Sequence, residues 1–279
     1  MKVGIIGYGF VGSALASGIK KNTNIIKIDP SLETNISDLV KFEPDICFIC
    51  VPTPMNKDGS QDISILNSVI EEISELKLSS LIVIKSTVLP DHISLFESKL
   101  PELVLNPEFL RERHAKEDFI NSKIIILGGQ SKSTTAVAKF YKEYTLCKTT
   151  EYHFTDLVSA SLVKYAINTF LATKVIFFNE LHEIFNKSGS KEDWEKFVKM
   201  ISLDNRIGSS HMQVPGIDDR LGFGGPCFPK DCNALIKYSE DIHRPFELLK
   251  KTRAINNKIR RKYKKLYKRE IEQNINYND

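Results

Sequence analysis

The sequence predicts an α/β fold, with an N-terminal Rossmann-type doubly wound parallel sheet and a mostly helical second domain that begins with a long connecting helix. From residue 1 to about 148, short apolar runs alternate with amphipathic ones, which is typical of βα units in a parallel sheet. From about Thr155 to Asn186, apolar residues recur at helical spacing instead. A chain of 279 residues has room for about two domains, which we place at residues 1–150 and 151–279.

The predicted elements follow these two patterns in chain order. The strand candidates are Lys2–Ile6, Ile25–Ile28, Ile46–Val51, Leu81–Lys85, Leu103–Leu105 and Lys123–Leu127. The helix candidates between and after them are Val11–Lys20, Ile36–Lys41, Ile63–Glu75, Asp91–Lys99 and Ser131–Tyr144. The second domain is expected to hold the long helix, then Glu192–Met200, Asp231–Ser239 and a basic C-terminal helix.

A glycine motif follows the first strand candidate. Gly7-Tyr8-Gly9-Phe10-Val11-Gly12 opens the first helix candidate, and Asp29 ends the second strand candidate. This order of strand, glycine turn, helix, strand and acid is that of a dinucleotide site, in which the glycines allow a tight turn, backbone approach to the pyrophosphate and close helix packing. Asp29 would accept hydrogen bonds from a ribose and repel a 2′-phosphate, so the motif favours NAD over NADP.

Polar residues follow three further strand candidates. The segments are Val51–Pro54, Ser86–Val88 and Asn106–Glu112. Ligands of open α/β sheets bind beyond the carboxyl ends of the strands, so we expect these segments to converge beside the glycine turn. Each segment by itself could be ordinary turn chemistry.

A cysteine lies in the glycine-rich, proline-bounded segment Gly222–Asp231, which reads GFGGPCFPKD. Glycines let the backbone approach a ligand, and a cation such as Lys230 favours the nucleophilic thiolate. A structural turn with a buried cysteine is the alternative. On the long helix, Lys164 and Asn168 are four residues apart and therefore on one face, either as part of a site or as a surface pair.

The five cysteines argue against a disulfide framework, because their number is odd and the sequence shows no secretion signal. Cys47 and Cys50 lie three apart in a strand candidate and point to opposite faces, so we expect buried residues and no metal site. The first strand begins at residue 2 and no apolar run approaches the ~20 residues of a membrane span, so we expect a cytoplasmic protein with no membrane partner.

The basic residues gather at the C-terminus. Residues 250–279 contain 11 lysines and arginines and three acids. We interpret this segment as a solvated helix end, because no nucleic-acid-binding motif accompanies it.

Eight motifs in order resemble the UDP-glucose 6-dehydrogenase family, within the UDP-glucose/GDP-mannose dehydrogenase superfamily. They are GYGFVG at 7–12, VPTP at 51–54, STV at 86–88, NPEFLRE at 106–112, KYAINTFLATK at 164–174, NE at 179–180, DNRIG at 204–208 and GFGGPCFPKD at 222–231. The resemblance is to a short form without the family's C-terminal UDP-binding domain. It implies a homodimer formed through the long helix and oxidation of a sugar C6 alcohol to a carboxylate with two NAD.

The resemblance also implies roles for single residues. Cys227 resembles the nucleophile that forms a thiohemiacetal and then a thioester. Lys164 and Asn168 resemble the pair that stabilises the oxyanion, and Asp231 the acid that works with the lysine through water. Glu108 resembles the base of thioester hydrolysis, Thr87 a residue that positions water, and Glu112 a second acid. The implied cofactor contacts are Gly7, Gly9, Phe10, Val11, Gly12, Asp29, Pro52, Thr53, Ser86, Thr87 and Lys230. The implied substrate contacts are Phe109, Leu110, Arg111, Lys164, Asn168, Phe223, Gly224, Cys227 and Arg206, which would reach a neighbouring subunit's substrate.

Three functions remain open at this point. The first is NAD-dependent oxidation of UDP-glucose. The second is the same chemistry on another nucleotide sugar, such as a UDP-N-acetylhexosamine or GDP-mannose. The third is a binding or partner subunit that is inactive alone. Basic residues between Lys250 and Arg269 would suit a diphosphate, as an alternative to their interpretation as a solvated helix end.

Overall fold

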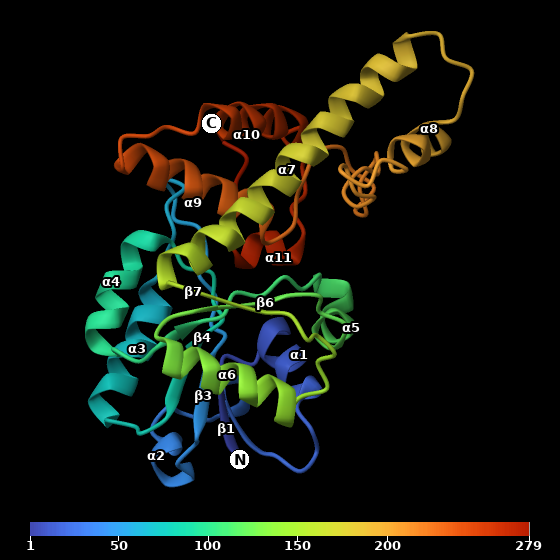
Figure 1. Cartoon of the computed structure of the whole chain (residues 1–279). Helices are drawn as coiled ribbons and strands as arrows, with labels where there is room; N and C mark the ends of the chain where they lie inside the picture. Colours follow the sequence, from blue (N-terminus) through green and yellow to red (C-terminus); the bar gives the residue numbers. More distant parts are fainter. Residues whose placement is uncertain (279) are drawn as a thin grey trace. The chain divides into compact units, whose positions relative to one another are not determined.

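The computed structural model describes residues 1–278, which form two compact units (Figure 1). Unit 1 comprises Met1–Thr53 and Gln61–Lys164, and unit 2 comprises Pro54–Ser60 and the chain from Tyr165 onwards. The predicted domain boundary lies at residue 150, whereas residues 151–164 belong to unit 1. They do so because they add a strand to its sheet and start a helix that packs on its core.

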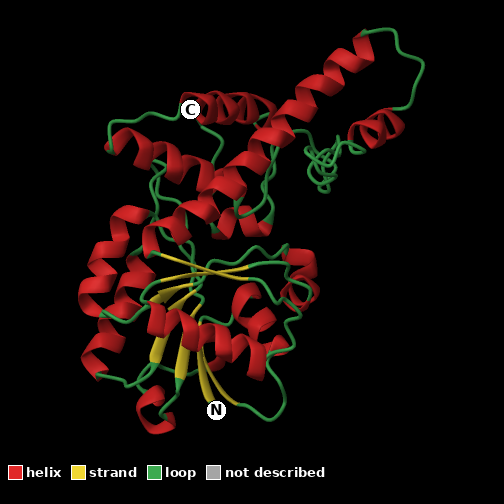
Figure 2. Ribbon diagram, in the orientation of Figure 1, coloured by secondary structure: helices red, strands yellow, loops and turns green. Residues whose placement is uncertain are grey.

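The sheet of unit 1, whose strands are yellow in Figure 2, has the strand order β2-β1-β3-β4-β5-β6-β7. The strands are β1 Lys2–Ile6, β2 Asn24–Ile28, β3 Ile46–Ile49, β4 Leu81–Ile84, β5 Val104–Leu105, β6 Ile125–Gly128 and β7 Tyr152–Thr155. The sheet is not wholly parallel as expected, because β5 and β6 pair antiparallel. The strand order reverses at β1 and β3, which is where open α/β sheets bind ligands.

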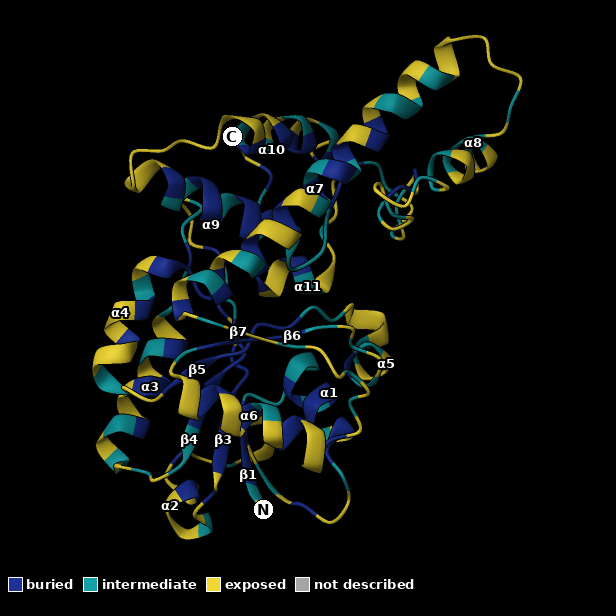
Figure 3. Cartoon of the chain, in the orientation of Figure 1, coloured by how far each residue is buried: buried dark blue, intermediate teal, exposed yellow. Residues whose placement is uncertain are grey.

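Two apolar cores cover the two faces of this sheet. The first contains Ile6, Ile49 and Ile84 with residues of α2, α3, α4 and the start of α7. The second contains Ile5, Phe48 and residues of α1, α5 and α6. Neighbouring strand residues alternate between the cores, and the strands are mostly buried (Figure 3). The helices are α1 Phe10–Gly18, α2 Asp38–Phe42, α3 Ser64–Leu76, α4 Pro90–Lys99, α5 Ala115–Ile120 and α6 Ser131–Tyr144.

Unit 2 is helical. Its helices are α7 Leu157–Lys187, which starts in unit 1, α8 Trp194–Ile201, α9 Phe228–Asp241, α10 Glu247–Arg260 and α11 Lys268–Glu272. Phe178 packs with Met212 and Val214 in a small core that Trp194 borders. By length and composition alone, α7 could cross a bilayer. However, Lys174 on α7 is buried and donates to two backbone carbonyls of unit 2, as expected of a core helix.

The basic C-terminal segment is not simply a solvated helix end. One face of α10 is buried, and this face carries Thr252, Asn256, Asn257 and Arg260 besides Leu249. Lys262, Lys264 and Lys265 are exposed, but α11 and Tyr277 fold back onto the unit and are partly buried. The buried face of α10 is largely polar, which is why apolar periodicity did not reveal it.

Candidate active site

The glycine turn lies where a dinucleotide would bind. Gly7 has φ +86°, and a Cβ there would lie 2.8 Å from the carbonyl of Cys50, so the chain ends of β1 and β3 touch. A Cβ at Gly12 would lie 2.1 Å from the Gly7 oxygen, so only glycine lets α1 pack so closely. A Cβ at Gly9, in contrast, would meet nothing within 4 Å. Gly9 caps the N-terminus of α1 without a side chain, which leaves open space for a phosphate.

Asp29 is held in place by protein donors. Oδ2 accepts from the N–H of Tyr8 at 2.7 Å, and Oδ1 accepts from the N–H and hydroxyl of Ser31. Burial raises the pKa of Asp29, but the hydrogen bonds outweigh it and hold the pKa below its ordinary value. The carboxylate is therefore ionised at neutral pH. An ionised carboxylate can accept hydrogen bonds from a ribose hydroxyl and would repel a 2′-phosphate.

The segments after β3 and β4 are joined to each other. The hydroxyl of Thr53 donates to the carbonyl of Thr87 at 3.0 Å, and the hydroxyl of Ser86 donates to the carbonyl of Val51 at 2.7 Å. Gln61 also donates to the Thr87 carbonyl and accepts from the N–H of Leu89. Within unit 1 the structure thus brings these predicted strand-end residues together and adds Gln61, which no motif singled out.

A buried ion pair links the segment after β5 to α7. Nζ of Lys164 lies 3.2 Å from Oε1 of Glu108 and donates to its carbonyl oxygen as well. The two side chains are 5% and 8% exposed. Oε2 of Glu108 accepts from the N–H of Leu110 at 2.7 Å, and the ring of Phe109 lies 5.3 Å from Nζ of Lys164. Two predicted catalytic residues, 56 positions apart, are therefore direct partners, and the surface-pair alternative for Lys164 is wrong.

A second buried lysine lies beside this pair. Nζ of Lys85 donates to Oδ1 of Asn106 at 3.0 Å and to the hydroxyl of Tyr141 at 3.2 Å. Desolvation lowers the pKa of Lys85. These residues and Glu108 line a cavity of about 30 Å³, which is room for one or two waters. Lys85 was not among the predicted site residues, because nothing in the sequence indicates that a lysine at the end of a strand is buried.

Cys227 stands at the N-terminus of α9. It is the N-cap residue, its carbonyl accepts from the N–H of Asp231 at 2.9 Å, and its side chain is partly exposed. The N-terminal end of a helix stabilises a thiolate, because its N–H groups and dipole present positive charge. This placement adds to the lysine argument from sequence and goes against a structural turn with a buried cysteine.

The predicted polar partners of unit 2 form a chain of contacts. Nδ2 of Asn168 donates to Oδ2 of Asp231 at 2.6 Å, and Nζ of Lys230 lies 2.6 Å from Oδ1 of the same carboxylate. Asp231 is 1% exposed and Asn168 is 7% exposed. Lys230, expected to contact the cofactor, is thus bonded to Asp231. Asp231 therefore fixes the side-chain orientation of Asn168.

The remaining predicted residues differ in exposure. Arg111 pairs with Asp118 in two hydrogen bonds and is exposed, as is Glu112. Arg206 is 89% exposed in its side chain and pairs with Asp204. The predicted residues that are buried or partly buried are Pro54, Leu110, Phe109, Phe10, Val11, Thr87, Phe223 and Gly224, whereas Pro52 is exposed.

Of the other cysteines, three are buried and Cys147 is partly buried. Burial raises the pKa values of Cys47 and Cys50 to about 12, and Cys232 is fully buried. Among residues 1–278, no group of three or more histidine, cysteine or acidic side chains could hold a metal ion.

Two domain models of one protein family match segments of this chain, one in each part of the fold. The NAD-binding domain of the UDP-glucose/GDP-mannose dehydrogenase family matches residues 31–145, and its central domain matches residues 158–258. A UDP-glucose 6-dehydrogenase of Rickettsia felis is 36% identical over 224 residues, covering 78% of this chain and 48% of the relative. One of Rickettsia typhi is 31% identical over 302 residues, covering 93% and 67%.

A solved structure also has a similar fold. A UDP-glucose dehydrogenase from the archaeon Pyrobaculum islandicum superimposes with a TM-score of 0.80 at 26% identity, over 93% of this chain and 68% of that one. The chain thus spans between about half and two thirds of the length of these relatives. The glycine turn and Asp29 fit the NAD that the family binds, and this chain belongs to the UDP-glucose/GDP-mannose dehydrogenase family.

Proposed function

We propose that this protein oxidises the C6 alcohol of UDP-glucose to the carboxylate of UDP-glucuronate, with Cys227 as the nucleophile. The observation that carries the proposal is the position of Cys227 at the N-terminus of α9, four residues before an Asp231 that is bonded to Asn168. Retention of the aldehyde as a thiol adduct requires a nucleophile of this kind beside groups that stabilise an oxyanion.

The residues of the chain account for each stage of the carbon chemistry. The C6 hydroxyl loses its proton and C6 loses a hydride, which gives the aldehyde. The thiolate of Cys227 adds to the aldehyde carbon, and the aldehyde oxygen takes up a proton from water to form a thiohemiacetal. Loss of that proton and of the second hydride leaves a thioester, which water cleaves to the carboxylate and the free thiol. When bound, NAD supplies the hydride acceptor in both oxidations, and the residues that would hold it are Gly9, Asp29 and the strand-end segments.

Lys164 and Asn168 are the groups that we assign to the oxygen of these intermediates. They are one helical turn apart on α7, so both can face one oxygen atom. Glu108, the ion-pair partner of Lys164, is the base that takes the proton of the hydrolytic water. Thr87 would orient that water. Asp231 holds Asn168 with its amide oriented. Glu112 is assigned as a second acid near the site, and Arg206 is assigned to a substrate contact.

The first experiment is to mix the protein with NAD and UDP-glucose and to follow NADH. Two NADH per sugar are expected, with none from Cys227→Ser and normal rates from Cys147→Ser, the matched control. Activity only with GDP-mannose or a UDP-N-acetylhexosamine would move the proposal to that substrate. NAD binding without NADH from any of these sugars would refute it and favour a subunit that needs another chain.

We also propose that the protein is a homodimer through α7. Phe170, Phe177 and Ile184 recur every seven residues and are 67%, 60% and 64% exposed, so they form one apolar stripe along the helix. Unpartnered apolar stripes of this kind are typical of protein interfaces. Light scattering should give twice the mass of 31.7 kDa, and Phe177→Glu should give a monomer. A monomeric wild-type protein at micromolar concentration would contradict the proposal.

A further inference from the structure

We infer that Glu270 is a positioning residue for the cysteine loop, here defined as Gly222–Cys227, and that it acts from the C-terminal segment of the chain. The inference rests on the proposed role of Cys227. Glu270 lies on α11, 43 positions after the nucleophile, and is 0% exposed. None of the motifs in the sequence includes it.

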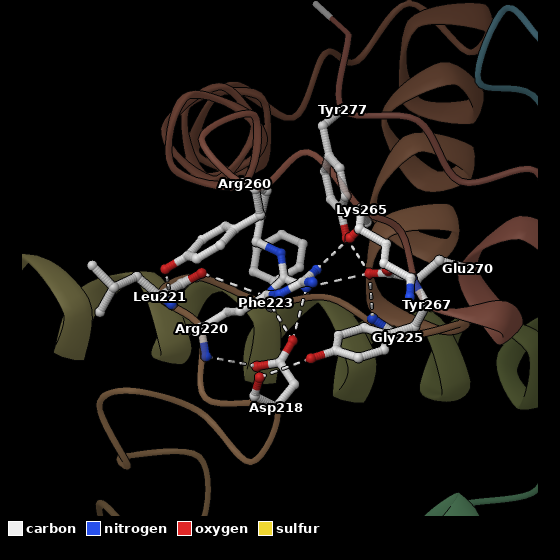
Figure 4. Close-up of polar contacts among 12 residues, drawn as sticks. Asp218, Arg220, Leu221, Phe223, Gly225, Arg260, Lys265, Tyr267, Glu270 and Tyr277 are labelled. Carbon is white, nitrogen blue, oxygen red and sulfur yellow. Dashed lines mark hydrogen bonds and ion pairs between the residues drawn. The ribbon is translucent and has the colours of Figure 1, made fainter.

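Glu270 bonds directly to the backbone of the loop. Its Oε1 accepts from the N–H of Gly225 at 3.1 Å, two residues before Cys227 (Figure 4). A Cβ at Gly224 would lie 2.7 Å from the same oxygen and 2.0 Å from Nη2 of Arg260. The loop backbone thus lies against the Glu270–Arg260 pair without an intervening side chain, so a displacement of the carboxylate displaces the loop.

The carboxylate is itself fixed by three further contacts. Oε1 lies 3.3 Å from Nη2 of Arg260 and accepts from the hydroxyl of Tyr277 at 2.6 Å. Oε2 accepts from the N–H of Tyr267 at 2.8 Å. Arg260 reaches on to Asp218 with two hydrogen bonds of 2.8 Å. Burial raises the pKa of Glu270, but these donors and the arginine hold it below its ordinary value, so a carboxylate is the acceptor.

Other side chains hold the earlier part of the loop in the same way. The N–H of Gly222 donates to Oδ1 of Asn179 at 2.9 Å, and Asn256 bonds both backbone groups of Phe223 at 2.7 and 3.0 Å. Side chains therefore hold Gly222, Phe223 and Gly225, and Glu270 holds the last of these, two residues before Cys227. Such support of a reacting group by fixed neighbours is what catalytic geometry requires.

Three substitutions separate loop positioning from simple charge balance. Glu270→Ala removes the acceptor. Glu270→Asp keeps the charge beside Arg260 but shortens the side chain by one methylene, so it no longer reaches Gly225. Glu270→Gln removes the charge and places an NH₂ against the N–H of Tyr267, yet keeps an oxygen for Gly225. Glu272→Gln, on the exposed side of the same helix, is the matched control.

The readout that does not depend on turnover is alkylation of Cys227 by iodoacetamide, measured peptide by peptide. Cys147 is the other partly exposed cysteine, and it lies in unit 1, so it serves as an internal reference. We expect the ratio of the Cys227 rate to the Cys147 rate to change at least threefold in the Ala and Asp variants. It should stay within twofold of wild type in the Gln and Glu272→Gln variants, although Glu270→Gln lowers the melting temperature.

Turnover gives the second readout. The kcat should fall about tenfold in the Ala and Asp variants and recover in Glu270→Gln, with the KM for NAD unchanged in all of them. A charge-balance role predicts the opposite order, with Asp near wild type and Gln impaired, and that order would overturn the inference. An unchanged alkylation ratio in Glu270→Asp would overturn it too. Absence of NADH from the wild-type protein would instead refute the proposed function and leave the alkylation result standing.

Discussion

Lys164→Met probes the buried ion pair of unit 1. Methionine keeps most of the bulk of the lysine stem and removes its charge, so the carboxylate of Glu108 loses its cation. The Glu108 carboxylate keeps the hydrogen bond from the N–H of Leu110. Removal of one partner of a buried pair costs about 3–5 kcal/mol, and both side chains here are less than a tenth exposed.

The hydrogen bond from the N–H of Leu110 still stabilises the unpaired carboxylate of Glu108. We therefore expect the low end of this range, a loss of about 3 kcal/mol in the free energy of unfolding. For a unit of this size the loss corresponds to a fall of about 6–12 °C in melting temperature.

A double-mutant cycle in urea, followed by circular dichroism, measures the pair. Its members are Lys164→Met, Glu108→Gln and the double variant, and the double variant should recover about 2 kcal/mol of the summed losses. Additive losses within about 0.5 kcal/mol would refute the reasoning.

Three further predictions follow from single positions. Gly9→Ala should keep the melting temperature but weaken NAD binding, measured by calorimetry, at least tenfold. Gly12→Ala should instead lower the melting temperature, because its Cβ would overlap the Gly7 oxygen. Equal effects of the two substitutions would contradict the geometry. Cys47 and Cys50, with pKa values near 12, should resist iodoacetamide at pH 8 in the folded protein, and rapid labelling of either would show that the strand is not buried as described. Asp29→Asn should narrow the preference for NAD over NADP in titrations of both cofactors, and an unchanged preference would exclude Asp29 as its source.

Much of unit 1 could be predicted from the sequence, because its signals are local. Alternating apolar and amphipathic runs indicated six strands within a few residues of their observed bounds. The strand Tyr152–Thr155 was missed because it is a short edge strand with two exposed residues, His153 and Phe154, and so has no apolar run that marks a buried strand. The antiparallel pairing of β5 and β6 was missed as well, since strand direction in a sheet depends on how the chain returns and not on the period of a strand.

The candidate site also has features that the sequence determines and features that only the tertiary structure decides. The glycine turn, the cysteine loop and the spacing of Lys164 and Asn168 were determined by the sequence alone, because backbone conformation and helical periodicity act over a few residues. Only the tertiary structure decided that Lys164 pairs with Glu108, that Asn168 pairs with Asp231, and that Glu270 holds Gly225. These partners lie between 45 and 63 positions apart, and no local pattern encodes which buried charges will meet. Desolvation makes such charges costly unless they are paired, so the packing of distant elements, and not the residue types, selects the partners.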